Sequence, residues 1–167
     1  MPTAPPVLLR LVHSDDLNDL YHLAELAGYG LTTLPADRGL LQERIEASLS
    51  GQTRLFVLED TTSKRVIGTS GITRSVGTDE PWYAYRLEHL EHASHGLGIQ
   101  RSLRVLHLHI IRDGPSEIGS LFLSPNARRG GVGRFLSLAR FLYVAENRTD
   151  FQDSFLTELR GVVDETG

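Results

Sequence analysis

The stretch LFLSPNARRGGVGR, residues 121–134, carries the most information about the fold, because it leads from an apolar segment through a basic turn into a glycine-rich helix start. A helix N-terminus presents four unpaired backbone N–H groups and about half a positive charge. Glycines let an anion approach that backbone closely, and Arg128, Arg129 and Arg134 add charge around the same point. The stretch therefore predicts a buried strand, a phosphate-binding turn and a helix.

Two better-known phosphate motifs are absent from this stretch. No Lys-Ser/Thr pair follows the glycines, as a Walker A loop requires, and the Gly-x-Gly-x-x-Gly pattern of dinucleotide sites is not satisfied. The alternative to an anion site is a solvated turn before a surface helix. We favour pyrophosphate binding at the turn 128–134, and the candidate residues for binding the whole ligand are Leu121, Phe122, Leu123, Arg128, Arg129, Gly130, Gly131, Val132, Gly133 and Arg134.

Hydrophobic periodicity predicts further strands and helices around this stretch. Strands are expected at 7–12, 53–59, 65–73, 83–91, 103–111, 117–123 and 155–163. Helices are expected from an N-cap at Ser14 to Gly28 and Gly30, along the stripe Leu41, Ile45 and Leu49, and from about Gly131 to Asn147. This order predicts an α/β (α+β) fold in which helices flank a mostly antiparallel central sheet.

Composition limits the classes of protein to which the chain can belong. A length of 167 residues predicts a single domain, and a net charge of −4 weakens any nucleic-acid function. The chain has no cysteine, which excludes disulfides, thiolate catalysis and Cys-ligated metal sites. The sequence shows neither an apolar run long enough for a membrane span nor a secretory signal, so we expect a cytoplasmic protein.

Further segments resemble the arginine N-succinyltransferase family of bacterial arginine degradation, in that family's order. They are residues 30–36, 55–60, 79–86, 92–94, 116–123, 140–142 and 158–162. The spacing of Arg128, Gly131 and Gly133 is also the one that GNAT acyltransferases use for the pyrophosphate of coenzyme A. The resemblance implies a GNAT-like acyl-CoA N-acyltransferase fold.

The resemblance also implies a reaction, the transfer of a succinyl group from succinyl-CoA to the α-amino group of L-arginine. Succinyl-CoA, or another acyl-CoA, would be a co-substrate, with no permanently bound cofactor, and the position of Leu121 is associated with succinyl-CoA in the family. Proteins of the family are about twice as long, and residues 1–167 resemble their N-terminal half. The histidine usually assigned as proton donor lies in the other half, so no residue here takes that role.

Three alternatives follow from this difference in length. The chain could be a non-catalytic CoA-binding half-subunit, or one that depends on a partner. It could also be a GNAT N-acetyltransferase acting on another amine. We expect a homo-oligomer, or a partner chain that supplies the remaining half, because an unpaired sheet edge favours association.

Several charged residues are candidates for substrate chemistry. Glu117 begins a predicted central strand and is a candidate general base, although a strand-end surface glutamate would have the same pattern. Glu158 and Arg160 could hold a guanidinium and a carboxylate respectively, or could form a plain cross-strand ion pair. Arg86 and His92 are further candidates for substrate binding.

Seven histidines raise the question of a metal site. His107 and His109 would share one face of a strand, but no carboxylate completes a recognisable ligand spacing. We therefore expect no metal. The chain also lacks the Gly-x-Ser-x-Gly nucleophile elbow, which argues against a hydrolase.

Overall fold

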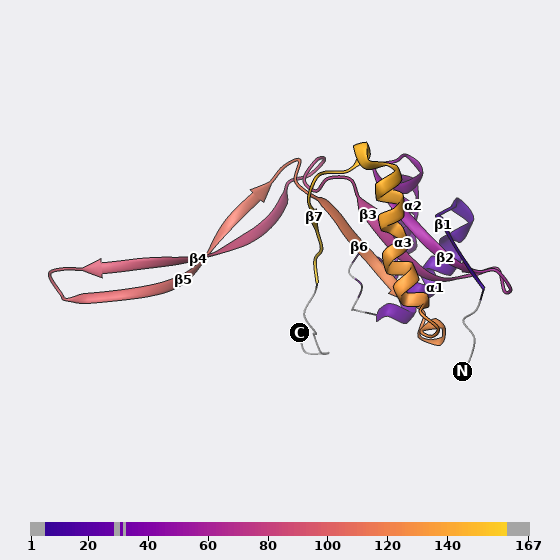
Figure 1. Ribbon diagram of the computed structural model, residues 1–167, viewed down its shortest axis with the longest axis horizontal. Coiled ribbons are helices and arrows are strands. Elements are labelled where there is room, and N and C mark those ends of the chain that lie inside the picture. The colour runs from indigo at the N-terminus through magenta and orange to yellow at the C-terminus, as the bar shows by residue number, and fades with distance from the viewer. Residues whose placement is uncertain (1–5, 29–30, 32, 160–167) are drawn as a thin grey trace. The chain divides into compact units, whose positions relative to one another are not determined.

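The computed structural model describes residues 6–28, 31 and 33–159, and the chain divides into two compact units. Residues 1–74 and 115–167 form one unit around a five-stranded sheet of order β1-β2-β3-β6-β7 (Figure 1). All neighbours in this sheet are antiparallel except the parallel pair of β6 and β7, which confirms a mostly antiparallel sheet. The strands are β1 Val7–Leu11, β2 Thr53–Asp60, β3 Arg65–Thr73, β6 Ser116–Leu123 and β7 Phe155–Leu156.

Helices cover both faces of this sheet (Figure 1). The alternation of β2 explains the arrangement, because Leu55 and Val57 pack on one face while Phe56 and Leu58 pack on the other. The first face is covered by α1 (Leu17–Ala27) and α2 (Arg38–Leu49), and the second by α3 (Val132–Glu146). No helix among the described residues is long and apolar enough to span a membrane.

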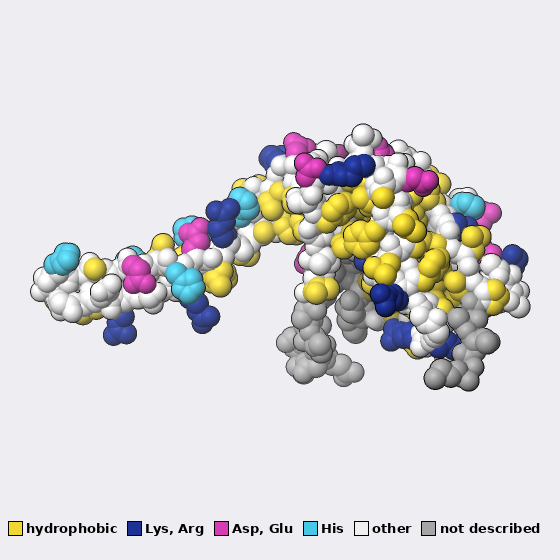
Figure 2. Space-filling model, in the orientation of Figure 1, with side chains coloured by type: hydrophobic (Ala, Val, Ile, Leu, Met, Phe, Trp, Pro, Cys, Tyr) yellow, Lys and Arg dark blue, Asp and Glu magenta, His cyan; other side chains and the backbone are white. Residues whose placement is uncertain are grey.

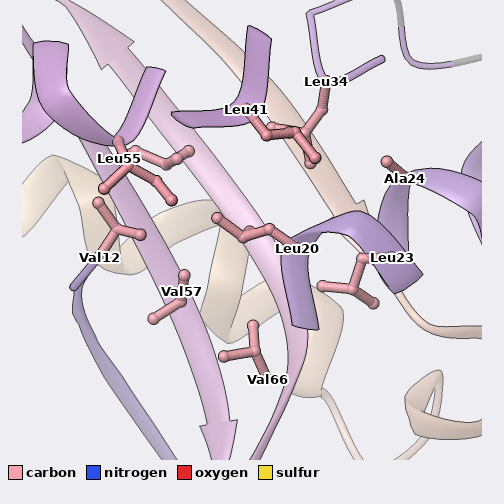
Figure 3. Packing of buried hydrophobic residues seen from close by; sticks show 10 residues of the cluster. Val12, Leu20, Leu23, Ala24, Leu34, Leu41, Leu55, Val57 and Val66 are labelled. Atoms are coloured by element: carbon pink, nitrogen blue, oxygen red, sulfur yellow. The ribbon is translucent and has the colours of Figure 1, made fainter. Parts of the chain in front are cut away.

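The core under α1 and α2 is built from aliphatic side chains of both helices and of the sheet (Figure 3). Leu20 of α1 and Leu41 of α2 are fully buried, and they pack in one cluster with Val57 and Val66. Each such burial stabilises the fold by about 1.5–3 kcal/mol. This core fixes α2, and with it Arg44, against the sheet.

The core under α3 contains one unexpected residue. The buried stripe of α3 repeats every four residues and consists of Val132, Leu136, Arg140 and Val144. Three of these side chains are apolar and pack on β2, two of them in a cluster with Leu58 and Val144 in a cluster with Phe56, whereas Arg140 places a charge on the same buried face. A charged side chain on such a stripe requires polar partners.

The second unit, residues 75–114, is a two-stranded antiparallel ribbon. Its strands are β4 (Trp82–Ser94) and β5 (Ile99–Ile111), paired without a break from Trp82↔Ile111 to Ser94↔Ile99. Both strands are longer than predicted, because the polar segment 99–102 lacks the apolar pattern of a strand but continues the ladder. Hydrogen bonding between strands needs no apolar face.

Two further predicted boundaries were wrong. Ser14 is not the N-cap of the first helix: a short 3-10 helix, η1 (Ser14–Asp16), precedes α1, and Asp16 instead accepts a 2.7 Å hydrogen bond from the backbone N–H of His13. The last strand was predicted over 155–163 but ends at Leu156 among the described residues, because it pairs with β6 at only two positions. Gly28 ends α1 as predicted, with a φ of 58°, and Gly30 lies outside the described residues.

Candidate functional site

A β-bulge interrupts the pairing of β3 and β6 in the centre of the sheet. The register passes from Thr69↔Phe122 to Gly71↔Gly119, so two residues of β6, Ser120 and Leu121, oppose one residue of β3. Ser120 has a φ of 50°, which is uncommon for a residue with a side chain. Such a conformation persists only where the surroundings hold it in place, and it is often found at functional sites.

The side chain of Ser120 is held from two directions. Its hydroxyl lies 3.1 Å from Thr33 Oγ1 in the segment before α2, and it accepts a 3.4 Å hydrogen bond from Nη2 of Arg44 on α2. A Cβ added at Gly71 would lie only 3.2 Å from the Ser120 Cβ, so β3 leaves room for the bulge by lacking a side chain there. The bulge is therefore fixed by the fold.

A hollow opens where β6 and β7 separate. The two strands pair only at Ser116↔Phe155 and Glu117↔Leu156, and beyond these positions they diverge. The space between them, which we call the β6–β7 hollow, has a volume of about 380 Å³. Its lining includes residues 117–121 on one side, residues 157–159 on the other, and Arg140 of α3.

Glu117 lies in this hollow and is partly buried. Burial raises the pKa of its carboxyl group, the negative charge of Glu158 raises it further, and the positive charge of Arg44 acts in the opposite direction. A carboxylate with a raised pKa is a better proton acceptor near neutral pH. The position of Glu117 is thus compatible with a general base.

A second hollow lies at the N-terminus of α3, at the predicted phosphate-binding turn. It measures about 350 Å³, and we call it the loop hollow. It is lined by Leu121, Phe122, Leu123, Arg128, Arg129, Gly130, Gly131, Gly133 and Leu136. The structure thus brings eight of the ten residues predicted for ligand binding to one place.

The individual groups of this turn differ in what they can offer an anion. Arg128 is held at the hollow, because its Nε donates a 3.0 Å hydrogen bond to the carbonyl oxygen of Leu123. Arg129 and Arg134 are exposed. Gly131 has a φ of 80° and nothing within 4 Å of the place where a Cβ would be, so its backbone is open to a ligand. Val132 is buried, and its N–H already donates to the carbonyl of Arg129 at 3.2 Å.

The two hollows meet at Leu121, which lines both and is 43% exposed. A ligand with a pyrophosphate at the loop hollow could therefore extend along β6, past the bulge, into the β6–β7 hollow. Such a ligand has a polyanionic end and a long, mostly uncharged arm. The arm would pass backbone groups of β6 that the bulge removes from the ladder.

The remaining predicted substrate residues are divided between the two units of the chain. Arg86 and His92 are exposed on the ribbon, where Nη1 of Arg86 lies 4.0 Å from a carboxylate oxygen of Glu88, and their role in substrate binding stays a prediction. Glu158 is exposed and lines the β6–β7 hollow, beyond the end of β7. Arg160 lies outside the described residues.

The histidines form no metal centre in the part of the chain that the structure describes, where no three His, Asp or Glu residues converge. Five of the seven belong to the ribbon. Across that ribbon His107 is paired with Arg86 and His109 with Ala84, neither of which is a metal ligand in this setting.

Three residues of the site were not predicted from the sequence. Arg140 interrupts the apolar stripe of α3 four residues after Leu136, a signal that could have found it. Arg44 gave a similar signal, because it lies next to Ile45 of the apolar stripe of α2. Burial lowers the pKa of Arg44 in the structure. Ser120 gave no signal, because a serine in a strand predicts nothing about its backbone conformation.

Comparison with known protein families identifies a match over nearly the whole chain. The family described as arginine N-succinyltransferase beta subunit matches residues 7–167. The arginine N-succinyltransferase of Photorhabdus laumondii is 41% identical over 170 residues, which cover 96% of this chain and 50% of that protein. The enzyme of the same description from Escherichia coli is 39% identical over 96% of this chain and 49% of its own length. The chain thus spans about half the length of the curated relatives it matches.

Solved structures give the same result. The arginine/ornithine succinyltransferase subunit AI from Pseudomonas aeruginosa superposes with a TM-score of 0.90 at 30% identity, over 98% of this chain and 53% of that one. A GNAT-family acetyltransferase from Staphylococcus aureus superposes with a TM-score of 0.54 at 10% identity, over 86% of this chain and 69% of that one. At that identity the likeness concerns the fold alone, which is the GNAT fold.

Proposed function

Because the chain belongs to the arginine N-succinyltransferase family, we propose that it transfers a succinyl group from succinyl-CoA to the α-amino group of L-arginine. The products are N2-succinyl-L-arginine and free coenzyme A. The expectation of a cytoplasmic enzyme that needs no metal is part of this proposal.

The observation that carries the proposal is the pair of hollows joined at Leu121 along the bulged strand β6. The loop hollow, with Arg128, Arg129 and the α3 N-terminus, supplies the positive potential that a pyrophosphate needs. Backbone N–H groups of 121–123 would orient the thioester, at the place where the bulge leaves Ser120 and Leu121 out of the regular pairing with β3. The reacting carbon would then lie at the entrance to the β6–β7 hollow.

The chemical step is a direct transfer that requires no covalent enzyme intermediate. The ammonium of the acceptor first gives a proton to Glu117, directly or through a water molecule. The neutral amine attacks the thioester carbonyl, the new C–N bond forms, and the C–S bond breaks. The departing thiolate takes up the second proton, which the nitrogen loses as the amide forms, to give free coenzyme A. The raised pKa of Glu117, caused mainly by burial, favours its role as proton acceptor.

Release of free thiol from succinyl-CoA tests this function. The chain contains no cysteine, so a thiol reagent reports only the product. We expect release that depends on L-arginine and is faster with succinyl-CoA than with acetyl-CoA. Acetyl-CoA as the faster donor would instead favour a GNAT N-acetyltransferase. A chain that neither releases thiol nor is stabilised by any acyl-CoA would contradict the proposal.

A second candidate function, a CoA-binding half-subunit that needs a partner chain, is favoured by two observations. The chain spans half the length of its relatives, and α3 exposes a row of apolar side chains (Figure 2). Phe135, Leu138 and Leu142 of that row are at least 44% exposed. Exposed apolar patches of this kind often mark protein interfaces.

The two functions differ in a simple experiment. A half-subunit would show a rise in melting temperature with succinyl-CoA but no thiol release until the partner is added. A self-sufficient enzyme would show both with the chain alone. Light scattering of the same sample gives the oligomeric state, for which we propose a homo-oligomer or a complex with a partner chain.

A further inference from the structure

Arg140 is the most buried charged side chain in the β6–β7 hollow, with only 5% of its surface exposed. Its Nε donates a 3.0 Å hydrogen bond to the carbonyl oxygen of Ser137, one turn earlier on α3. Its Nη1 lies 3.4 Å from the carbonyl oxygen of Gly119, next to the bulge. The guanidinium is therefore fixed between α3 and β6, beside the place proposed for the thioester.

No negative charge balances this guanidinium in the part of the chain that the structure describes. Burial lowers the pKa of Arg140, and no carboxylate opposes that effect or lies within salt-bridge distance. Arg10 shows the contrast, because Asp16 and Glu59 lie 2.7 and 3.0 Å from its guanidinium nitrogens. A buried cation without a counter-charge is costly, and a bound anion would remove that cost.

We propose that Arg140 recognises the distal carboxylate of a dicarboxylic acyl group, and thereby selects succinyl-CoA over acyl-CoA of the same length without that charge. The inference rests on the proposed function and names the residue that would set its donor specificity. A guanidinium suits this task, since its planar donors match both oxygens of a carboxylate.

The placement of Arg140 favours the acyl carboxylate over the carboxylate of the acceptor amino acid. Gly119, which Arg140 contacts, and Leu121, which joins the two hollows, flank Ser120 at the bulge. An acyl chain attached at the bulge therefore begins within one or two residues of the guanidinium. Glu117 lies towards the other end of β6. The ammonium of the acceptor would give its proton to Glu117 on that side.

Equilibrium binding to the whole 167-residue chain tests the proposal, with coenzyme A, butyryl-CoA and succinyl-CoA as probes. Butyryl-CoA has the same four-carbon chain and lacks only the carboxylate. We expect the wild-type chain to bind succinyl-CoA about ten-fold or more tightly than butyryl-CoA, as a charge-assisted hydrogen bond would give. In Arg140→Met, which keeps an unbranched side chain, the two ligands should bind equally well, with little change for coenzyme A.

Arg134→Met is the matched control, because Arg134 belongs to the proposed pyrophosphate turn. It should weaken all three ligands alike and leave the ratio of succinyl-CoA to butyryl-CoA unchanged. If Arg140→Met does not fold, the wild-type ratio and Arg140→Lys, which keeps the charge and should retain part of the preference, decide the question.

Three results would overturn the inference. If the wild-type chain binds coenzyme A but does not prefer succinyl-CoA to butyryl-CoA, Arg140 does not recognise the acyl carboxylate. The CoA-binding part of the proposed function would still stand. An unchanged preference in folded Arg140→Met would assign it to another residue. Arg140→Met could also keep the preference for succinyl-CoA but no longer select L-arginine over agmatine, which lacks the carboxylate. Arg140 would then bind the carboxylate of the acceptor instead. Failure to bind coenzyme A at all would instead contradict the proposed function itself.

Discussion

Thr69 Oγ1 donates a 2.6 Å hydrogen bond to the carbonyl oxygen of Ser120, across the point at which β3 and β6 lose their register. Both residues are buried: Thr69 is 0% exposed and Ser120 is 4% exposed. The bond satisfies a carbonyl group that the bulge removes from the normal ladder. The Thr69 side chain therefore helps to hold the backbone of Ser120 in its conformation with positive φ.

Replacing Thr69 by valine should destabilise the protein, because the isosteric side chain leaves the Ser120 carbonyl without its donor. A buried acceptor without a partner costs about 1–3 kcal/mol. Urea unfolding followed by circular dichroism measures the loss. Thr69→Ser is the control, since it keeps the hydroxyl group and should recover part of the stability. A Thr69→Val chain as stable as the wild type would mean that the bulge does not depend on this bond.

A methyl group at Gly131 should weaken the binding of coenzyme A. The φ of 80° makes any side chain unfavourable there, and the added Cβ would project into the open space where a phosphate approaches the backbone. We expect Gly131→Ala to raise the dissociation constant of coenzyme A several-fold, as measured by calorimetry.

The matched control for this change is Gly98→Ala in the turn between β4 and β5. Gly98 also has a positive φ, 61°, and no atom within 4 Å of its Cβ position, so it carries a similar backbone cost. It should lower stability without changing the affinity for coenzyme A. Equal losses of affinity in both variants would show that backbone strain, and not access to the anion site, accounts for the Gly131 result.

The large elements and the position of the loop hollow could be predicted from the sequence because both depend on local patterns. The pattern of a hairpin, a strand and a turn followed by a returning strand, predicted β3 over 65–73 with its observed bounds, and glycines followed by a helical stripe located the N-terminus of α3. Eight of the ten residues predicted for ligand binding line one hollow, since they lie within a short stretch of the chain, 121–133. Contiguity makes such a site predictable.

The β6–β7 hollow could not be predicted in the same way, because it depends on long-range geometry. It requires β6 to be bulged at Ser120, β7 to end after two residues, and Arg140 to reach Gly119 from a helix. None of these follows from a pattern within ten residues. The prediction extended β7 beyond Leu156 because the sequence there still favours a strand. In the structure the pairing with β6 has already ended at that position.

Glu117→Gln should remove most of the proposed activity and at the same time stabilise the chain at neutral to alkaline pH. As a base, Glu117 acts in its deprotonated form, so the wild-type rate should rise as pH passes upward through its raised pKa. Burial raises the pKa of Glu117 by disfavouring the carboxylate. The contribution of this carboxyl group to the stability of the folded state is therefore lost as pH rises through the raised pKa. Glutamine carries no charge and avoids this loss.

Two measurements check this expectation. Initial rates against pH should show the rising limb in the wild type and a low, flat profile in Glu117→Gln. Melting temperatures should be similar for the two chains at acidic pH and should diverge in favour of the variant as pH rises. Full activity of Glu117→Gln would exclude Glu117 as the base, whatever its effect on stability.

Arg10 connects β1, η1 and β2 through two carboxylates, and this network predicts an acid-sensitive fold. Its Nη1 and Nη2 donate to the two oxygens of Asp16 at 2.7 and 2.8 Å, and its Nε donates to Glu59 at 3.0 Å. Burial alone would raise the pKa of Asp16, but hydrogen bonds from Arg10 and His13 outweigh it and lower the pKa. The hydrogen bond from Arg10 likewise lowers the pKa of Glu59.

A carboxyl group with a lowered pKa stabilises the fold above its unfolded pKa, about 4, and this contribution disappears as pH falls through the folded value. Asp16→Asn should therefore lose about 1–3 kcal/mol at pH 7 through its weakened bonds to Arg10. It should also lose less further stability than the wild type between pH 5 and pH 3, the range around the unfolded carboxyl pKa of about 4 in which the unfolded chain takes up its protons. Urea unfolding across this pH range measures both effects. Asp15→Asn is the control, because Asp15 is the exposed neighbour and carries the same charge. If both variants follow the same pH dependence, net charge and not the Arg10 network governs acid stability.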